Sequence, residues 1–176
     1  AAWPSDQAPS VDGLVDALAR NLIQRGLGGA HMAGNSLGGW FALELLRRKM
    51  AASVTAFSPA GAWATLDDYL AIARRFRTTM EHGDRVPPAE LATAFRAMTR
   101  TRILARLLTS IERDGPIAPI RTEGVPVTIA WGEKDKVIPY ESFGTAMVAR
   151  VAGARVVTTV GCGHVPMYDD PEQIAS

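Results

Sequence analysis

The sequence predicts an α/β fold in which a parallel sheet is covered by helices on both faces. Strand-length apolar runs alternate with segments of helical hydrophobic period over residues 11–60 and again over residues 115–176. Such alternation is typical of parallel strands joined by right-handed helical crossovers. A serine turn, GNSLG at residues 34–38, stands between a predicted strand and a predicted helix. Functional residues in such sheets collect at the carboxyl ends of the strands, and we expect them there.

Composition and charge exclude several classes of protein. The chain has 176 residues, of which 47% are hydrophobic, and a net charge of +1, which is typical of one globular domain with a sizeable core. This near-neutral charge gives no reason to expect nucleic acid as a partner, and no apolar run is long enough to span a membrane. A single cysteine, Cys162, excludes an internal disulfide bond and fits a reducing compartment. We expect a cytoplasmic location, with the alternative that a targeting signal preceded residue 1.

The first part of the chain predicts two helices and two strands. Ser10 is a suitable N-cap for the first helix, and Gly26 is a suitable terminator. Val54 and Phe57 belong to a β-rich run that Pro59 stops. The expected elements, in chain order, are a loop over residues 1–9, a helix over 11–24, a strand over 28–33, a helix to about residue 50, and a strand over 53–58.

The middle of the chain, residues 61–114, differs in character. It is rich in arginine, has helical propensity, and is interrupted by Gly83, Pro87 and Pro88. We predict helices over about 66–81 and 89–112 and interpret the stretch as an inserted helical cap. Residues 1–60 and 115–176 would then form the core domain. The cap's apolar side chains suggest an apolar substrate pocket, or alternatively form the cap's own core: Trp63, Leu66, Tyr69, Leu70, Phe76 and Met80.

The last part of the chain returns to regular alternation. A buried type of strand is predicted over residues 125–131 and another strand over 155–160, with a helix over 140–151 between them. Residues 171–174 have the composition of the first turn of a helix. Asp135 follows the first of these strands and His164 follows the second, so both are expected at the strand ends where Ser36 also lies.

The serine turn has the features of a strained strand-to-helix connection. Gly34 and Gly38 would remove side chains that crowd such a turn. Ser36 would then stand at a helix N-terminus, where the dipole and free N–H groups favour negative charge. The backbone N–H of Leu37 would point at an oxyanion formed on a substrate carbonyl. The alternative is a serine that only caps the helix.

Three segments together resemble a known superfamily. They are GNSLGG at 34–39, WGEKDKVIP at 131–139 and GCGHVPMYDDPE at 161–172, and they resemble the α/β-hydrolase fold superfamily, whose catalytic triad follows the chain order serine, acid, histidine. The resemblance implies that His164 is the general base for Ser36 and that Asp135 orients the imidazole. Taken alone, Asp135 is better explained as a turn residue between Lys134 and Lys136.

The resemblance also limits the chemistry. Superfamily members that dehalogenate alkanes or open epoxides use an aspartate nucleophile, whereas position 36 is serine. The main expectation is a serine hydrolase that acts on an ester, lactone or related carbonyl of a small, apolar substrate through an acyl-enzyme. One alternative is a carbon–carbon bond hydrolase of the same fold, and another is a non-catalytic binding module or inactive fragment. No cofactor and no metal site are expected, since no Cys/His cluster has ligand spacing.

The same resemblance implies that the first strands of the fold, and the loop carrying a second oxyanion donor, are missing from the sequence. Only the Leu37 half of an oxyanion hole can be assigned. The strand before Ser36 would become an open sheet edge, which is prone to pairing. We therefore expect a fragment, or a chain that is complemented by an N-terminal half or by assembly into a homo-oligomer.

Other chemistry-bearing residues have simpler explanations. Cys162 lies two positions before His164, but a small buried residue explains it better than a Cys–His pair does. His31 is expected to be structural within its strand, and His82 to be exposed in the cap. Glu133 and Asp169 are acids near the strand ends, and the pair at 169–170 is expected to cap the last helix.

Overall fold

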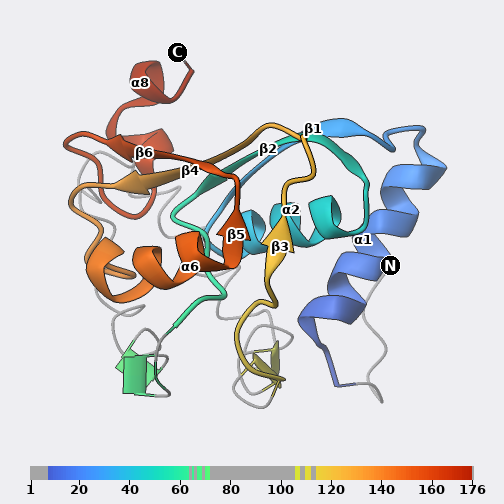
Figure 1. Ribbon diagram of the computed structural model, residues 1–176, viewed down its shortest axis with the longest axis horizontal. Coiled ribbons are helices and arrows are strands. Elements are labelled where there is room, and N and C mark those ends of the chain that lie inside the picture. Colours follow the sequence, from blue (N-terminus) through green and yellow to red (C-terminus); the bar gives the residue numbers. More distant parts are fainter. Residues whose placement is uncertain are drawn as a thin grey trace, which may run out of the picture.

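The structure is a computed structural model that describes residues 8–63, 65, 67–68, 70–71, 106–107, 110–111 and 114–175 (Figure 1). Its centre is a four-stranded, fully parallel sheet in the order β1-β2-β4-β6. The strands of this sheet are β1 (Ala30–Asn35), β2 (Ala51–Phe57), β4 (Val127–Gly132) and β6 (Arg155–Thr159). The α/β class and the parallel sheet that the sequence predicts are confirmed.

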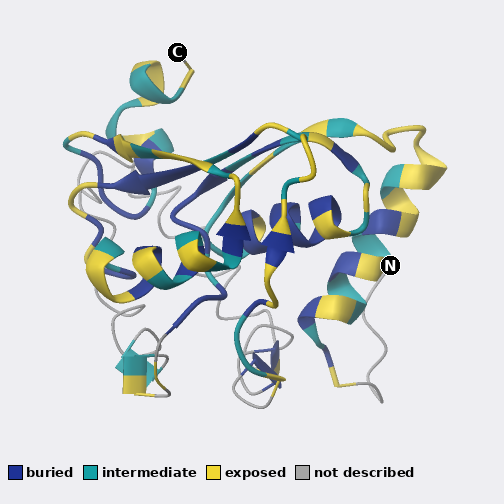
Figure 2. Ribbon diagram, in the orientation of Figure 1, coloured by how far each residue is buried: buried dark blue, intermediate teal, exposed yellow. Residues whose placement is uncertain are grey.

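Helices connect these strands. Among the described elements, α2 and α6 lie along one face of the sheet, while α8 lies on the other side beside β6 (Figure 1). The buried apolar residues concentrate between the sheet and the first of these layers, where Leu43, Ile129 and Met147 are fully buried (Figure 2). The helices are α1 (Val11–Gln24), α2 (Leu37–Arg47), α6 (Thr145–Arg150), α7 (Pro166–Asp169) and α8 (Pro171–Ala175).

The first helix forms as its sequence predicts. The Ser10 hydroxyl accepts a hydrogen bond from the N–H of Gly13 at 3.1 Å, which satisfies one of the free donors at the helix N-terminus. Gly26 follows the helix with a positive φ of 70°, a conformation that glycine adopts without strain. The predicted bounds of 11–24 are therefore confirmed.

Several predicted bounds are wrong by two or three residues. The strand expected over 28–33 is β1 at Ala30–Asn35, because Gly29 (φ 77°) belongs to a turn and Asn35 still pairs with Phe57 of β2. The helix expected to reach residue 50 ends at Arg47, since Lys49 takes a φ of 60° and donates back to the carbonyl of Leu46. This closes the helix with a left-handed residue.

The structure also contains elements that the sequence did not suggest. A second, two-stranded sheet pairs β3 (Ile120–Arg121) with β5 (Val151–Ala152). The helix predicted over 140–151 begins with a π-helical turn, Tyr140–Gly144, in which the N–H of Thr145 bonds to the carbonyl of Tyr140. The short helix α7 precedes the predicted terminal helix. The helices expected over 66–81 and 89–112 lie largely outside the described residues, as does His82.

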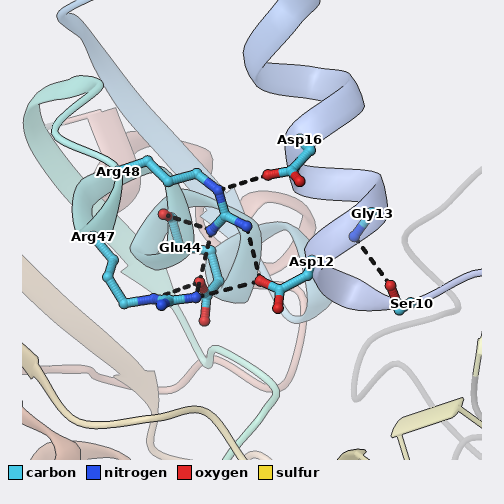
Figure 3. A network of polar contacts seen from close by, with 7 residues as sticks. All are labelled: Ser10, Asp12, Gly13, Asp16, Glu44, Arg47 and Arg48. Carbon is cyan, nitrogen blue, oxygen red and sulfur yellow. Dashed lines mark hydrogen bonds and ion pairs between the residues drawn. The ribbon is translucent and has the colours of Figure 1, made fainter.

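A network of charges fastens α1 to α2 (Figure 3). The side chain of Glu44 is only 5% exposed, and its carboxylate forms ion pairs with Arg47 at 2.6 Å and with Arg48 at 2.9 Å. Both arginines also reach Asp12, and Arg48 reaches Asp16 at 3.0 Å. Burial of Arg48 is the largest single influence on its pKa and lowers it. The hydrogen bonds to Asp12, Asp16 and Glu44 together outweigh this effect, so the pKa of Arg48 is raised. The contacts between the two helices are therefore those of the arginines with Asp12 and Asp16 on α1, and the buried Glu44 holds the two guanidinium groups in place from within α2. No helix among the described residues is both long and apolar enough to cross a membrane.

Removing the charge of Glu44 is expected to weaken the packing of α1 on α2. Glu44→Gln keeps the side chain's shape but leaves two guanidinium groups short of a buried partner, and the free energy of unfolding should fall by about 1 to 2 kcal/mol. Urea unfolding followed by circular dichroism measures this change. The matched control is Glu123→Gln, because Glu123 pairs with Lys49 at 3.8 Å where both side chains are exposed. The control should change stability by less than about 0.5 kcal/mol. Equal losses in both variants would contradict the prediction.

Candidate active site

The serine turn connects β1 to α2 through a strained backbone. Ser36 has φ 55° and ψ −119°, a conformation that a residue with a Cβ adopts only at a cost. A Cβ built at Gly34 would lie 2.3 Å from the carbonyl oxygen of Gly38, so glycine is required there. Gly39 likewise lies against Pro59. The expectation for Gly38 is wrong, because a Cβ at that position would meet nothing within 4 Å.

Backbone hydrogen bonds hold Ser36 from both sides. Its N–H donates to the carbonyl of Phe57 at 2.9 Å, and its own carbonyl accepts from Trp40 at 3.1 Å and from Ala60 at 2.9 Å. The helix begins at Leu37, so the Leu37 N–H belongs to the first turn, whose donors have no partner within the helix. This N–H and the positive end of the helix dipole are therefore available to an anion beside Ser36.

Asp135 lies in the turn after β4, and its two oxygens have separate partners. One oxygen, Oδ1, accepts the N–H groups of Val137 and Ile138, each at 2.9 Å. The other, Oδ2, lies 2.9 Å from Nδ1 of His164. The carboxylate side chain is fully buried. Two backbone donors thus hold Oδ1, and Oδ2 is the oxygen that faces the imidazole.

The partner of Asp135 is His164, in the loop after β6. Since the carboxylate can only accept, Nδ1 of the imidazole must donate, and this hydrogen bond fixes the tautomer. In the neutral ring Nε2 is then the acceptor. It is buried and has no hydrogen-bond partner among the described residues. The arrangement therefore holds the imidazole through Nδ1 and leaves Nε2 without a partner among the described residues.

The acid turn and the histidine loop are in close contact. A Cβ at Gly132 would lie 2.1 Å from the carbonyl oxygen of Gly163, and the N–H of Lys134 donates to the carbonyl of Cys162 at 2.8 Å. The Glu133 carboxylate accepts from the N–H of Gly161 at 2.7 Å. The loops after β4 and β6 thus pack as one unit around the Asp135–His164 pair.

One residue that the sequence analysis overlooked connects this unit to the serine turn. Asn35, directly before Ser36, donates from Nδ2 to the carbonyl of His164 at 2.8 Å and to the carbonyl of Phe57 at 3.1 Å. Nothing in the sequence could have identified it, because the contact joins positions 129 residues apart.

Ser36 itself follows β1, so serine, acid and histidine all occupy loops at the carboxyl ends of parallel strands, as expected.

The remaining candidates have structural roles. Cys162 is fully buried, as predicted. His31 is exposed and bonds across to Ser53 on β2 at 2.8 Å. Of the two acids expected to cap the last helix, Asp170 does so by accepting from Gln173 at 2.9 Å. Asp169 instead accepts from the N–H of Gly163 at 2.6 Å and so holds the histidine loop.

A cavity of about 470 Å³ lies away from these residues. Its walls include Trp40, Glu44 and Ile117, and none of Ser36, Asp135 or His164 lines it. Within the described part of the chain, no group of three or more His, Cys, Asp or Glu side chains is placed to hold a metal ion.

Comparison with known proteins identifies the fold and a family. A profile described as "Alpha/beta hydrolase family" matches residues 3–176. "Epoxide hydrolase EphH" of Mycobacterium tuberculosis is 30% identical over 191 aligned positions, covering 92% of this chain and 89% of the relative. Solved structures with the same fold include a bacterial membrane phospholipase A (22% identity, TM-score 0.73) and a meta-cleavage product hydrolase from Pseudomonas fluorescens (17% identity, TM-score 0.73). These cover 98% of this chain, which spans 62% and 71% of theirs.

The backbone strain at Ser36 should have a measurable effect on the free energy of unfolding. Glycine tolerates φ 55°, so Ser36→Gly is expected to raise the free energy of unfolding by about 1 kcal/mol relative to Ser36→Ala, after the entropic cost of glycine. Both variants lack the hydroxyl, and the comparison therefore isolates the backbone. Thermal and urea unfolding provide the measurement. An alanine variant as stable as the glycine variant would show that the turn is unstrained.

The thiol of Cys162 is expected to be unreactive in the folded protein. Burial, aided by the negative charges of Asp169 and Asp170, raises the pKa of this thiol, and the nucleophilic thiolate is therefore scarce near pH 7. Ellman's reagent should modify it only when urea unfolds the chain. Rapid modification of the folded protein would instead indicate an activated thiol beside His164.

Proposed function

The chain belongs to the alpha/beta hydrolase family, and from this premise we propose that it is a serine hydrolase of carboxylic esters, lactones or related carbonyl compounds. Ser36 is the nucleophile, His164 the general base, and Asp135 the acid that orients the imidazole. The observation that carries the proposal is the buried Asp135–His164 hydrogen bond, because it leaves Nε2 as an unpartnered acceptor in the loop that Asn35 joins to the serine turn.

The chemistry follows from these positions. As the Ser36 hydroxyl attacks the substrate carbonyl, its proton passes to Nε2 of His164, and Asp135 stabilises the resulting imidazolium. The N–H of Leu37 donates a hydrogen bond to the tetrahedral oxyanion, and the positive end of the α2 dipole stabilises its charge. The imidazolium then protonates the leaving group, which leaves an acyl-enzyme. A water molecule, deprotonated by the same histidine, releases the acid and restores Ser36.

The name of the M. tuberculosis relative favours epoxide hydrolysis as a second candidate. The serine at position 36 argues against epoxide hydrolysis. A carboxylate that opens an epoxide forms an ester, whose carbonyl water can then attack. A serine hydroxyl that opened an epoxide would form an ether, and an ether has no carbonyl through which the enzyme could be regenerated. Carbon–carbon bond hydrolysis with the same three residues remains an alternative, as does a binding role without catalysis.

A fluorophosphonate probe tests the proposal on the intact chain. Wild-type protein should gain the mass of one probe adduct, and Ser36→Ala should gain none. Asp135→Asn should slow hydrolysis of p-nitrophenyl esters by about 10⁴-fold, because the imidazole loses its tautomer and its counter-charge.

Parallel assays separate the alternatives. Styrene oxide hydration that persists in Ser36→Ala would replace the proposal with epoxide chemistry at another residue. Cleavage of a vinylogous 1,5-diketone together with inertness toward esters would assign carbon–carbon bond hydrolysis. A folded wild-type protein that the probe never labels would support the binding role.

A further inference from the structure

Asn35 makes a side-chain hydrogen bond that links the strand before the serine turn to the histidine loop. It ends β1, and its Nδ2 group makes two hydrogen bonds, to the carbonyl of His164 at 2.8 Å and to the carbonyl of Phe57 at 3.1 Å. Both acceptors are backbone oxygens: Phe57 is the last residue of β2, and His164 lies in the loop after β6. A single amide group therefore connects the ends of β1 and β2 to the loop after β6.

We propose that Asn35 is a positioning residue that sets the distance between the Ser36 hydroxyl and the His164 imidazole. The proposal rests on the proposed function, in which those two groups exchange a proton. The side chain touches neither reacting atom. It acts through the backbone of His164, and it stands one position before the nucleophile in the chain.

The remaining contacts of His164 explain why such a connection is needed. Asp135 orients the imidazole, and the carbonyl of Cys162 is held by the turn after β4. These contacts place the histidine relative to β4 and β6. Ser36 is placed by β1 and β2, since its N–H bonds to Phe57. The Asn35 amide ties these two groups of strands together, and proton transfer requires donor and acceptor to stay within hydrogen-bond reach.

The chemistry of the contact explains the residue type. Two carbonyl oxygens are acceptors only, so the side chain between them must supply two hydrogens. A carboxamide does this from one nitrogen. Aspartate has the same shape but would place negative charge against both carbonyls, and alanine would leave the His164 carbonyl without this donor.

The test compares Asn35→Asp and Asn35→Ala with wild type in ester hydrolysis and probe labelling. Both variants should lower kcat by about 10²-fold with little change in KM, because a small displacement of the base affects the chemical step and not binding. The Asn35→Asp variant carries a pH signature. As the pH falls and the introduced carboxyl group gains a proton, it regains one donor, and its rate relative to wild type should rise. The Asn35→Ala ratio should not change with pH.

Gln173→Ala serves as the control, because it removes a different side-chain contact of the chain after β6. Gln173 donates from its side-chain amide to the carbonyl of Val160 at 3.2 Å. Gln173→Ala therefore removes an exposed amide-to-carbonyl bond from this loop, together with the 3.4 Å contact of the same nitrogen with Asp170, and it should leave kcat near the wild-type value. A loss equal to that of Asn35→Ala would show general loosening of the loop and would overturn the specific role.

A spectroscopic readout separates this proposal from the proposed function. The low-field proton resonance of the His164 Nδ1–H should shift or broaden in Asn35→Ala and remain in Gln173→Ala, whether or not the protein is catalytic. Wild-type protein that the probe does not label would contradict the proposed function alone. Asn35 variants with wild-type kcat, wild-type pH dependence and an unshifted resonance would overturn the positioning role.

Discussion

The hydrogen bond between Asp135 and His164 is the interaction on which the arrangement of the site depends. It joins loops that follow neighbouring strands, β4 and β6, and both partners are buried. Two further contacts exist only because the loops approach so closely: the packing of Gly132 on Gly163 and the bond from Lys134 to Cys162. Removal of the carboxylate would leave a buried imidazole without a partner for Nδ1, which costs more than the bond itself contributes. The Asp135–His164 pair therefore holds the two loops together and also fixes the tautomer of the imidazole.

The sheet supplies the second requirement, a common edge for all three loops. Parallel strands in the order β1-β2-β4-β6 bring residues 36, 135 and 164 to the same side, although they are far apart in the chain. Within the described residues β1 is an edge strand, with His31 and Ala33 exposed. An edge strand is less constrained than a central one. Contacts that cross from β1 to the rest of the sheet, above all those of Asn35 and Ser36 with Phe57, consequently carry more of the task of holding Ser36 in place. Whether another strand pairs with this edge, as the sequence analysis expects, stays a prediction.

How much the sequence predicts depends on how local the cause is. The cap and approximate length of α1 follow from Ser10 and Gly26, both local signals, and the prediction of a helix from Val11 to about Gln24 is confirmed. The need for glycine at position 34 also follows from the turn alone. The true start of β1 could not be predicted, because it depends on the register with β2. Asn35 and Asp169 could not be recognised either, since their partners lie in another loop and hydrogen-bonding capacity alone does not reveal a partner. Motif order indicates the candidate residues Ser36, Asp135 and His164, whereas the contacts that hold them can be seen only in the fold.

The backbone of Ser36 shows how stability and function are related in this turn. A residue with a Cβ at φ 55° and ψ −119° is retained only where the surroundings determine the conformation. Here three backbone hydrogen bonds do so: the N–H of Ser36 donates to the carbonyl of Phe57, and its carbonyl accepts from Trp40 and Ala60. The Ala60 bond ties the carbonyl of Ser36 to the segment that follows β2, so the turn is fixed by the sheet on one side and by this segment on the other. The strain falls on the residue directly before Leu37, where α2 begins and where the backbone N–H groups of the first turn have no partner within the helix.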